Sequence, residues 1–145
     1  MIKNRNMKKG LIYFFFASLV FVACSKSGDN PAPTPPPTAT PEATIEFSID
    51  PDPGTTIYAS LGASQSIAVN ISSKLPTTGV TIDVKTTKDS DGSTVSSSSV
   101  ASNAAKNTIS VDNLTAGVLC TTTITVTSKS KADNNALKSF KIARK

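Results

Sequence analysis

The sequence contains no histidine and no tryptophan. Without histidine there can be no Ser-His-Asp triad, no HExxH zinc site and no imidazole general base. The two cysteines are too few for a zinc cluster, and neither a GxxxxGK(S/T) nor a GxGxxG phosphate-binding motif occurs. We therefore expect no catalytic residues, no metal site and no cofactor, and we interpret the chain as non-enzymatic.

A membrane-spanning apolar run is also missing. The longest apolar run, Leu11–Ala23, has 13 residues and includes one serine. At about 1.5 Å per residue it would cover about 20 Å of a hydrocarbon core roughly 30 Å thick. Basic residues precede this run, as in the n-region of a secretory signal: Lys3, Arg5, Lys8 and Lys9. The pattern predicts a signal peptide over residues 1–23.

The apolar run ends in Phe21-Val22-Ala23-Cys24. This ending resembles the lipobox of bacterial lipoproteins, which implies diacylglyceryl transfer to the Cys24 sulfur and signal cleavage between Ala23 and Cys24. The new amino group is then usually acylated with a chain such as palmitate, and two or more chains give stable anchoring. An ordinary signal peptide, cleaved after Ala17 or Ala23, stays open as the alternative. The residue after Cys24 is Ser25 and not the aspartate that often directs retention in the inner membrane. We therefore expect a lipid anchor in the cell outer membrane, on the periplasmic or the surface-facing side.

The chain has almost no excess of one charge once the signal peptide is removed. The full chain has 15 basic and 10 acidic residues, a net charge of +5. Four of the basic residues precede Cys24 and all the acidic ones follow it, which leaves eleven basic and ten acidic side chains, a net of +1. The basic balance therefore belongs mainly to the signal peptide, and we expect no nucleic-acid partner. We interpret the basic C-terminal residues as a solvated strand face.

Prolines concentrate in one segment after Cys24. Six of them lie between Ser25 and Ala43, among alanine and threonine. Such a segment favours an extended, unpaired backbone, so residues 24–43 are predicted to be the lipidated cysteine and a disordered Pro-rich linker. At about 3.1 Å per residue the linker would reach up to roughly 60 Å. Residues 44–145 then form one domain of ordinary size.

The domain shows an alternation of apolar and polar residues and no helical period. This alternation predicts strands with one buried face, and turn sequences such as Asp91-Gly92 and Asp133-Asn134-Asn135 separate them. The apolar positions are Ile45, Phe47, Ile49, Ile67, Val69, Ile71, Val80, Ile82, Val84, Ile109, Val111, Cys120, Ile124, Val126, Phe140 and Ile142. We predict an all-β fold, an antiparallel sandwich of about seven strands. The unpaired Cys120 is expected to be buried.

The stretch Leu114-Thr115-Ala116-Gly117, followed by Cys120, resembles the turn between strands E and F of fibronectin type III and related immunoglobulin-like domains. The resemblance implies an immunoglobulin-like sandwich, with Cys120 in place of the corner tyrosine. The whole layout also resembles small Thr-rich lipoproteins of Bacteroidota-type bacteria.

Few residues are candidates for ligand contact. After Cys24 the aromatic residues are Phe47, Tyr58 and Phe140. Sugars usually stack on exposed rings, and only Tyr58 has a position that could be available; otherwise it is a core-edge tyrosine. The pairs Asp50/Asp52 and Asp89/Asp91 lie in turns, where we expect solvent-facing carboxylates with ordinary pKa values, and we interpret Asp89–Gly92 as a plain turn rather than a calcium loop.

The Ser-rich stretch Ser93–Ser102 is expected to form either an irregular edge strand or a loop. Edge strands can accept a partner strand, and lysines such as Lys138 and Lys141 on the last strand would guard against this. The function expected from these features is a lipid-anchored interaction or accessory module of the cell envelope. It would bind the membrane through the lipid on Cys24 and contact a protein or glycan partner. The alternative is a glycan-binding accessory lipoprotein.

Overall fold

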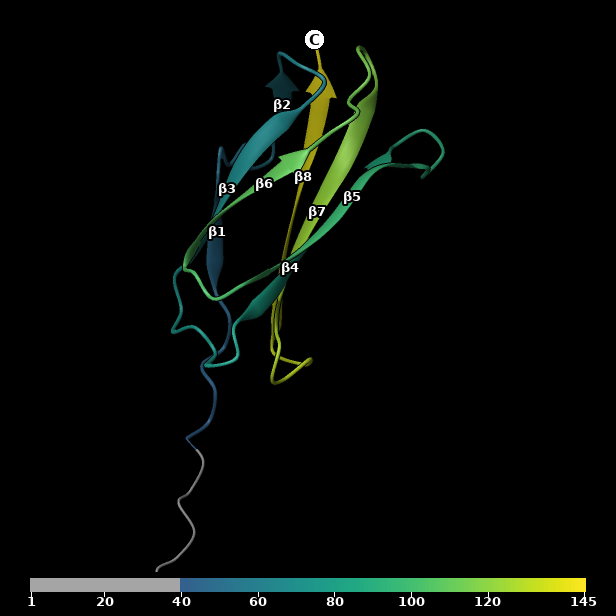
Figure 1. Cartoon of the computed structure of the whole chain (residues 1–145). Helices are drawn as coiled ribbons and strands as arrows, with labels where there is room; N and C mark the ends of the chain where they lie inside the picture. The colour runs from purple at the N-terminus through teal and green to yellow at the C-terminus, as the bar shows by residue number, and fades with distance from the viewer. Residues whose placement is uncertain (1–39) are drawn as a thin grey trace, which may run out of the picture. The chain divides into compact units, whose positions relative to one another are not determined.

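The computed structural model describes residues 40–145 (Figure 1). The predicted signal peptide, Ala23, Cys24 and residues 25–39 of the predicted linker lie outside the described residues. The part that is described forms eight strands and no helix, so no helix in this part is long and apolar enough to cross a membrane. The strands are β1 Phe47–Asp50, β2 Ile57–Ser60, β3 Gln65–Ile71, β4 Val80–Lys88, β5 Thr94–Ser102, β6 Lys106–Val111, β7 Leu119–Ser128 and β8 Asn135–Arg144.

The strands form two sheets that face each other (Figure 1). One has the order β1-β3-β6 and the other the order β2-β8-β7-β4-β5. All pairings are antiparallel except the parallel pairing of β2 with β8. This arrangement, with chain crossovers between the two sheets, is an immunoglobulin-like sandwich. The all-β prediction is confirmed, with eight strands where about seven were expected.

One hydrophobic core lies between the sheets. Alternate residues of β3, β4 and β7 are buried, so the predicted period of two locates the core face. Apart from Leu114, the buried hydrophobic residues are the sixteen alternating apolar positions of the sequence, Phe47 and Phe140 among them. Cys120 is 1% exposed and has no disulfide partner among the described residues, which confirms the expectation that it is buried.

The core also contains one polar pair. Thr86 of β4 and Thr122 of β7 are fully buried and occupy directly opposite positions. Their hydroxyl oxygens lie 2.8 Å apart in a hydrogen bond. Each hydroxyl therefore satisfies the other where no water can reach it.

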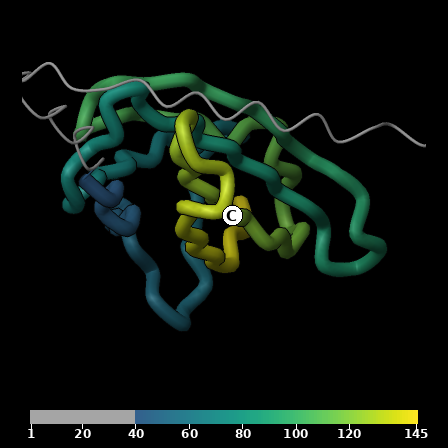
Figure 2. Tube along the Cα trace, turned by 90° about the horizontal axis from the view of Figure 1, so that it is seen from below, coloured from purple at the N-terminus to yellow at the C-terminus, as the bar shows by residue number. Residues whose placement is uncertain are grey.

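The described chain begins and ends at opposite ends of the sandwich (Figure 1). Residues 42–43 lie against the β7–β8 loop, where Asn134 Nδ2 donates to Glu42 Oε2 and to the Ala43 carbonyl. The other end holds the C-terminus, where Lys145 N donates to Ser60 O. We refer to these as the entry end and the distal end. The β4–β5 loop lies at the distal end and projects from the rest of the domain (Figure 2).

The Ser-rich stretch forms an edge strand with one irregularity, as one of the two expectations had it. β5 pairs with β4 from Ser102 to Thr94, and the register shifts once, between Thr86 and Thr87. Of the two predicted edge lysines, Lys141 lies in the half of β8 that β2 covers. Because β2 pairs with this half of β8, the expectation that Lys141 guards a free edge was wrong. Lys138 forms an ion pair with Asp52 at 3.7 Å. Lys138 lies in the half of β8 that β2 does not cover, and its guarding role stays a prediction.

Candidate functional site

The outer face of the five-stranded sheet is covered with hydroxyl side chains. Residues that alternate with the buried core residues of β7 point to this face, and after Leu119 they are all threonines: Thr121, Thr123, Thr125 and Thr127. On β4 the same face carries Thr81, Asp83, Lys85 and Thr87. The face is mostly polar, with exposed Leu119 and Leu137 on it, and the two charges on β4 have opposite signs.

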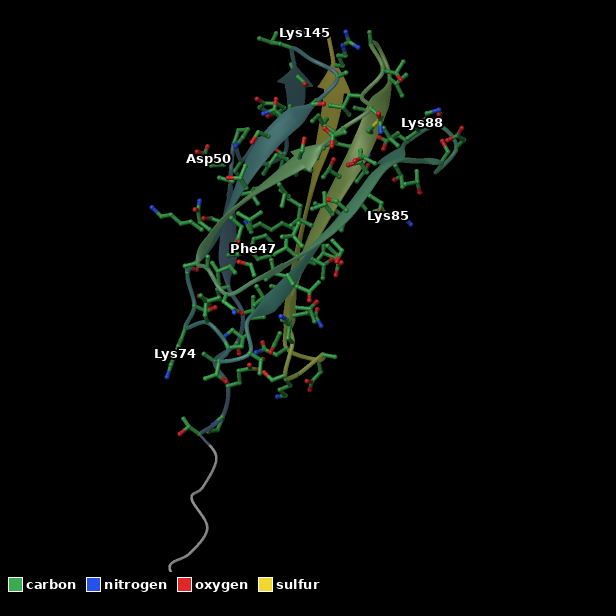
Figure 3. All side chains as sticks on the ribbon, viewed as in Figure 1. Phe47, Asp50, Lys74, Lys85, Lys88 and Lys145 are labelled. Carbon is green, nitrogen blue, oxygen red and sulfur yellow. The ribbon has the colours of Figure 1, made fainter. Side chains whose placement is uncertain are left out.

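Next to β5 this face is hollowed. A shallow depression of about 540 Å³ is lined by residues of three neighbouring strands, β5, β4 and β7: Asp83, Val84, Lys85, Ser97, Ser98, Ser99, Thr123 and Thr125. Lys85 points away from the core, whereas Phe47 lies between the sheets (Figure 3). The lining is mostly hydroxyl and contains no aromatic ring. Such a surface suits hydrogen bonding to a polar partner more than stacking on a sugar ring.

An ion pair joins three elements at the distal end of the same face. Lys141 Nζ lies 2.5 Å from Asp89 Oδ2 and 2.7 Å from Thr121 Oγ1. Thr121 Oγ1 also donates to Asp89 Oδ1 at 2.6 Å. The hydrogen bonds from Lys141 and Thr121 hold the pKa of Asp89 below its ordinary value.

The predicted acidic turn residues have structural partners. Asp91 Oδ1 accepts a hydrogen bond from Ser93 N at 2.9 Å, and the bonds from Ser93 lower the pKa of Asp91. The expectation of ordinary pKa values was therefore wrong for Asp89 and Asp91, because each carboxylate accepts hydrogen bonds that favour its charged form. The segment forms a hairpin loop closed by Lys88 N bonded to Ser93 O, so the interpretation as a turn is confirmed. Within residues 40–145, no three acidic or cysteine side chains gather in a metal-binding arrangement.

Tyr58 and Cys120 are both directed toward the core. Tyr58 of β2 is half-buried and packs against the core cluster. Cys120 is buried, and burial raises the pKa of its thiol, with the nearby Asp89 charge adding to the effect. Neither residue lies in the outer-face depression. Cys24 and Ala23, the predicted lipidation and cleavage residues, lie outside the described residues.

A second polar cluster lies at the entry end, and no motif in the sequence predicts it. Glu42 Oε1 accepts hydrogen bonds from Ser128 and Ser130, each at 2.8 Å. Asn134 Oδ1 in turn accepts from Ile45 N at 3.0 Å. Bonds from Asn134, Ser130 and Ser128 lower the pKa of Glu42. The cluster fastens residues 42–45 to the β7–β8 loop, so the folded unit includes Glu42 and Ala43, which the sequence assigned to the linker.

The edge strand β5 has no neighbour on its outer side among the described residues. It contains no charged residue and no proline, and most of its side chains are exposed on both faces. Charge and proline are the usual means by which an edge strand is kept from pairing. The outer face, its depression and the β5 edge adjoin one another in the five-stranded sheet.

A comparison of the chain with protein-family models finds no matching family, and a comparison with curated proteins finds no match. The order of the strands in the two sheets defines the class as an immunoglobulin-like β-sandwich.

Proposed function

We propose that this protein is a lipid-anchored, non-enzymatic interaction module of the bacterial cell envelope, held in the outer membrane through Cys24. The N-terminal sequence supports the anchor, because a short apolar run ends in Val22-Ala23-Cys24 after a basic start. The Pro-rich segment after Cys24 would serve as the spacer between the membrane and the folded domain.

The observation that carries the interaction role is the surface beside β5. A hydroxyl-rich sheet face there meets an uncharged, unpartnered edge strand. Proteins that recognise an extended segment use such an edge for backbone hydrogen bonds. The carboxylates Asp89 and Asp91 near this face have lowered pKa values, which does not suit the role of a general acid, because a general acid needs a raised pKa.

The anchor is tested by intact-mass analysis of protein extracted from bacterial membranes. We expect the wild-type chain to begin at Cys24 with added acyl mass, and Cys24→Ser to lose that mass and enter the soluble fraction. Cys120→Ser is the matched control and should stay in the membrane, since Cys120 is buried. A soluble wild-type protein without lipid would overturn the proposal.

The interaction role is tested with photo-crosslinking in living cells. A benzoylphenylalanine placed at Ser97, in the depression, should give discrete crosslinked adducts. The same group at Ser66 of β3, in the opposite sheet, should not. Equal adduct patterns at both positions would contradict an interaction surface beside β5. Protease treatment of intact cells would show on which side of the outer membrane the domain lies.

The glycan-binding alternative receives less support from the described residues. Phe47 and Phe140 are buried, and Tyr58 is half-buried against the core. A ring that faces the core has little surface for stacking on a sugar. We expect a glycan array to give no binding that depends on Tyr58; binding that disappears in Tyr58→Ala would reverse the order of the two proposals.

A further inference from the structure

β5 is the longest of the edge strands in the described part of the chain. Each sheet has two edges: β1 and β6 in one sheet, and β2 and β5 in the other. β1 and β2 have 4 residues each. β6 has 6 residues and begins with Lys106, whereas β5 has 9 and no charge. β5 is therefore the edge best suited to accept another strand.

The register of the sheet shows which β5 residues have free backbone groups. Lys129 N donates to Gly79 O, so the Gly79 carbonyl turns toward β7, while the Gly79 N–H donates to Pro76 O. Because this direction alternates along an antiparallel strand, β4 residues at even positions from Val80 turn toward β5, and their partners on β5 turn back toward β4. The β5 residues between those partners direct both N–H and C=O away from the sheet: Ser97, Ser99 and Ala101.

A bulge limits the usable part of β5. Thr86 pairs with Ser96 but Thr87 pairs with Thr94, so Val95 is the extra residue of the bulge. The strand is regular from Ser96 to Ser102, and the middle of this segment is Ser99. Ser99 is also the middle one of the three outward-directed residues.

With Ser99 at the centre of the regular segment, a second copy of the same strand can pair with β5 without a bulge in the contact. We propose that β5 pairs antiparallel with β5 of a second copy of this chain, about a two-fold axis through Ser99. Ser99 then lies opposite its own copy, and Ser97 opposite Ala101. Each such pair exchanges both of its backbone hydrogen bonds.

The side chains on both faces are compatible with this pairing. On the outer face only serine and alanine meet, so the contact contains no like charges and no bulky side chains. On the inner face Val100, which is 39% exposed, lies opposite Ser98 of the second copy. The new strand therefore covers an apolar side chain that the free domain leaves in water.

The dimer is expected to be reversible, because a single strand pairing buries less surface than a permanent interface. Here the inference rests on the proposed function: anchoring in a membrane would confine the copies and raise their local concentration. The pairing itself is a property of the folded domain, so it can be tested even if Cys24 carries no lipid.

Cysteine crosslinking of the full chain in membranes tests the register. Opposite residues of a hydrogen-bonded pair have Cα atoms about 5.5 Å apart, within the range of a disulfide. Ser99→Cys should give a covalent dimer on a non-reducing gel after mild oxidation. Ser97→Cys alone should not, because position 97 of one copy would lie about 14 Å from position 97 of the other. Differently tagged chains carrying Ser97→Cys and Ala101→Cys should crosslink to each other when they are expressed together.

Two outcomes of the crosslinking experiment would overturn the inference. One is a Ser99→Cys chain no more crosslinked than Ser139→Cys, an exposed control on the outer face of β8. The other is equal crosslinking at all β5 positions, which indicates random collision or a different partner. As a second measurement, sedimentation of the detergent-extracted wild-type chain should show a concentration-dependent dimer, and Ser99→Lys should remove it. A Ser99→Lys chain that keeps the wild-type dimer would also overturn the inference.

The two proposals fail in different ways. Lipid mass on the wild-type chain without crosslinking at Ser99 would leave the anchor and remove the dimer. Crosslinking at Ser99 in a chain without lipid would leave the dimer and remove the anchor.

Discussion

Thr122 shows how a single hydroxyl depends on its partner. Thr122→Val leaves the buried Thr86 hydroxyl without its 2.8 Å hydrogen bond. We expect a loss of about 1–3 kcal/mol in the free energy of unfolding, measured by urea denaturation. Restoring the match with Thr86→Val in the same chain should recover most of this loss, because no polar group is then left unpaired.

The control for this prediction lies one residue away. Thr123 points to the outer face, where its hydroxyl oxygen is 3.4 Å from that of Ser139. Thr123→Val should change stability by less than about 0.5 kcal/mol. Equal losses at Thr122 and Thr123 would contradict the role given to the buried pair.

Asp89 predicts a pH dependence of stability. Its pKa is lowered in the folded state by hydrogen bonds from Lys141 and Thr121. The stabilisation is therefore fully present above the unfolded-state pKa of about 3.9 and is lost as the pH falls through the lower folded-state value. Wild type should exceed Asp89→Asn in stability at pH 6, and the difference should shrink below about pH 4.

Lys141→Gln provides the matched control for Asp89. Like Asp89→Asn, the Lys141→Gln protein should be less stable than wild type at pH 6, because it lacks the first of the bonds that lower the pKa of Asp89. Thermal unfolding at several pH values measures all three proteins. A difference between wild type and Asp89→Asn that grows as the pH falls would contradict this assignment.

At the scale of strands, Gly79 fixes the start of β4. Its φ is +80°, and a Cβ at this position would meet the Ser102 carbonyl oxygen and the Asn103 side chain. Gly92 has a similar φ of +71°, but a Cβ there meets nothing within 4 Å. Gly92→Ala should thus cost only the backbone strain, about 1 kcal/mol.

Gly79→Ala should cost clearly more than Gly92→Ala, because it adds a clash with a backbone oxygen that cannot rotate away. Urea denaturation of the two variants measures the difference. Equal losses would show that the β5–β6 loop yields easily, and would contradict the close packing of Gly79 on Ser102.

The strands that the sequence predicts well are those with one buried face. In β3, β4 and β7 most of the residues that face the core are apolar, with the polar exceptions Thr86, Thr122 and Ser128. β5 is exposed on both faces, so alternation gives no information, and only its pairing with β4 makes it a strand. No local sequence pattern predicts the parallel pairing of β2 with β8 either.

The candidate surface was predictable only in part. The sequence suggests that Ser93–Ser102 could be an edge, but the depression requires Asp83, Lys85 and Thr123 from other strands. The contacts of Glu42 with Asn134 join residues 92 positions apart. Such contacts depend on the strand order, which alternation along single strands does not determine.

At the scale of the whole molecule, the positions of the two chain ends determine how a pulling force would load the domain. The chain enters at one end of the sandwich, leading to β1, and leaves from β8 at the other (Figure 1). A force between these points runs along the strands. The hydrogen bonds of β1 with β3 and of β8 with β7 lie across this force and would be loaded together, in shear, rather than opened one by one.

Pulling the domain at residues 40 and 145 in a force spectrometer should therefore require a higher unfolding force than pulling it at Gly92 and Lys145, which both lie at the distal end. A protein held at one end by a membrane and at the other by a partner would then resist extension.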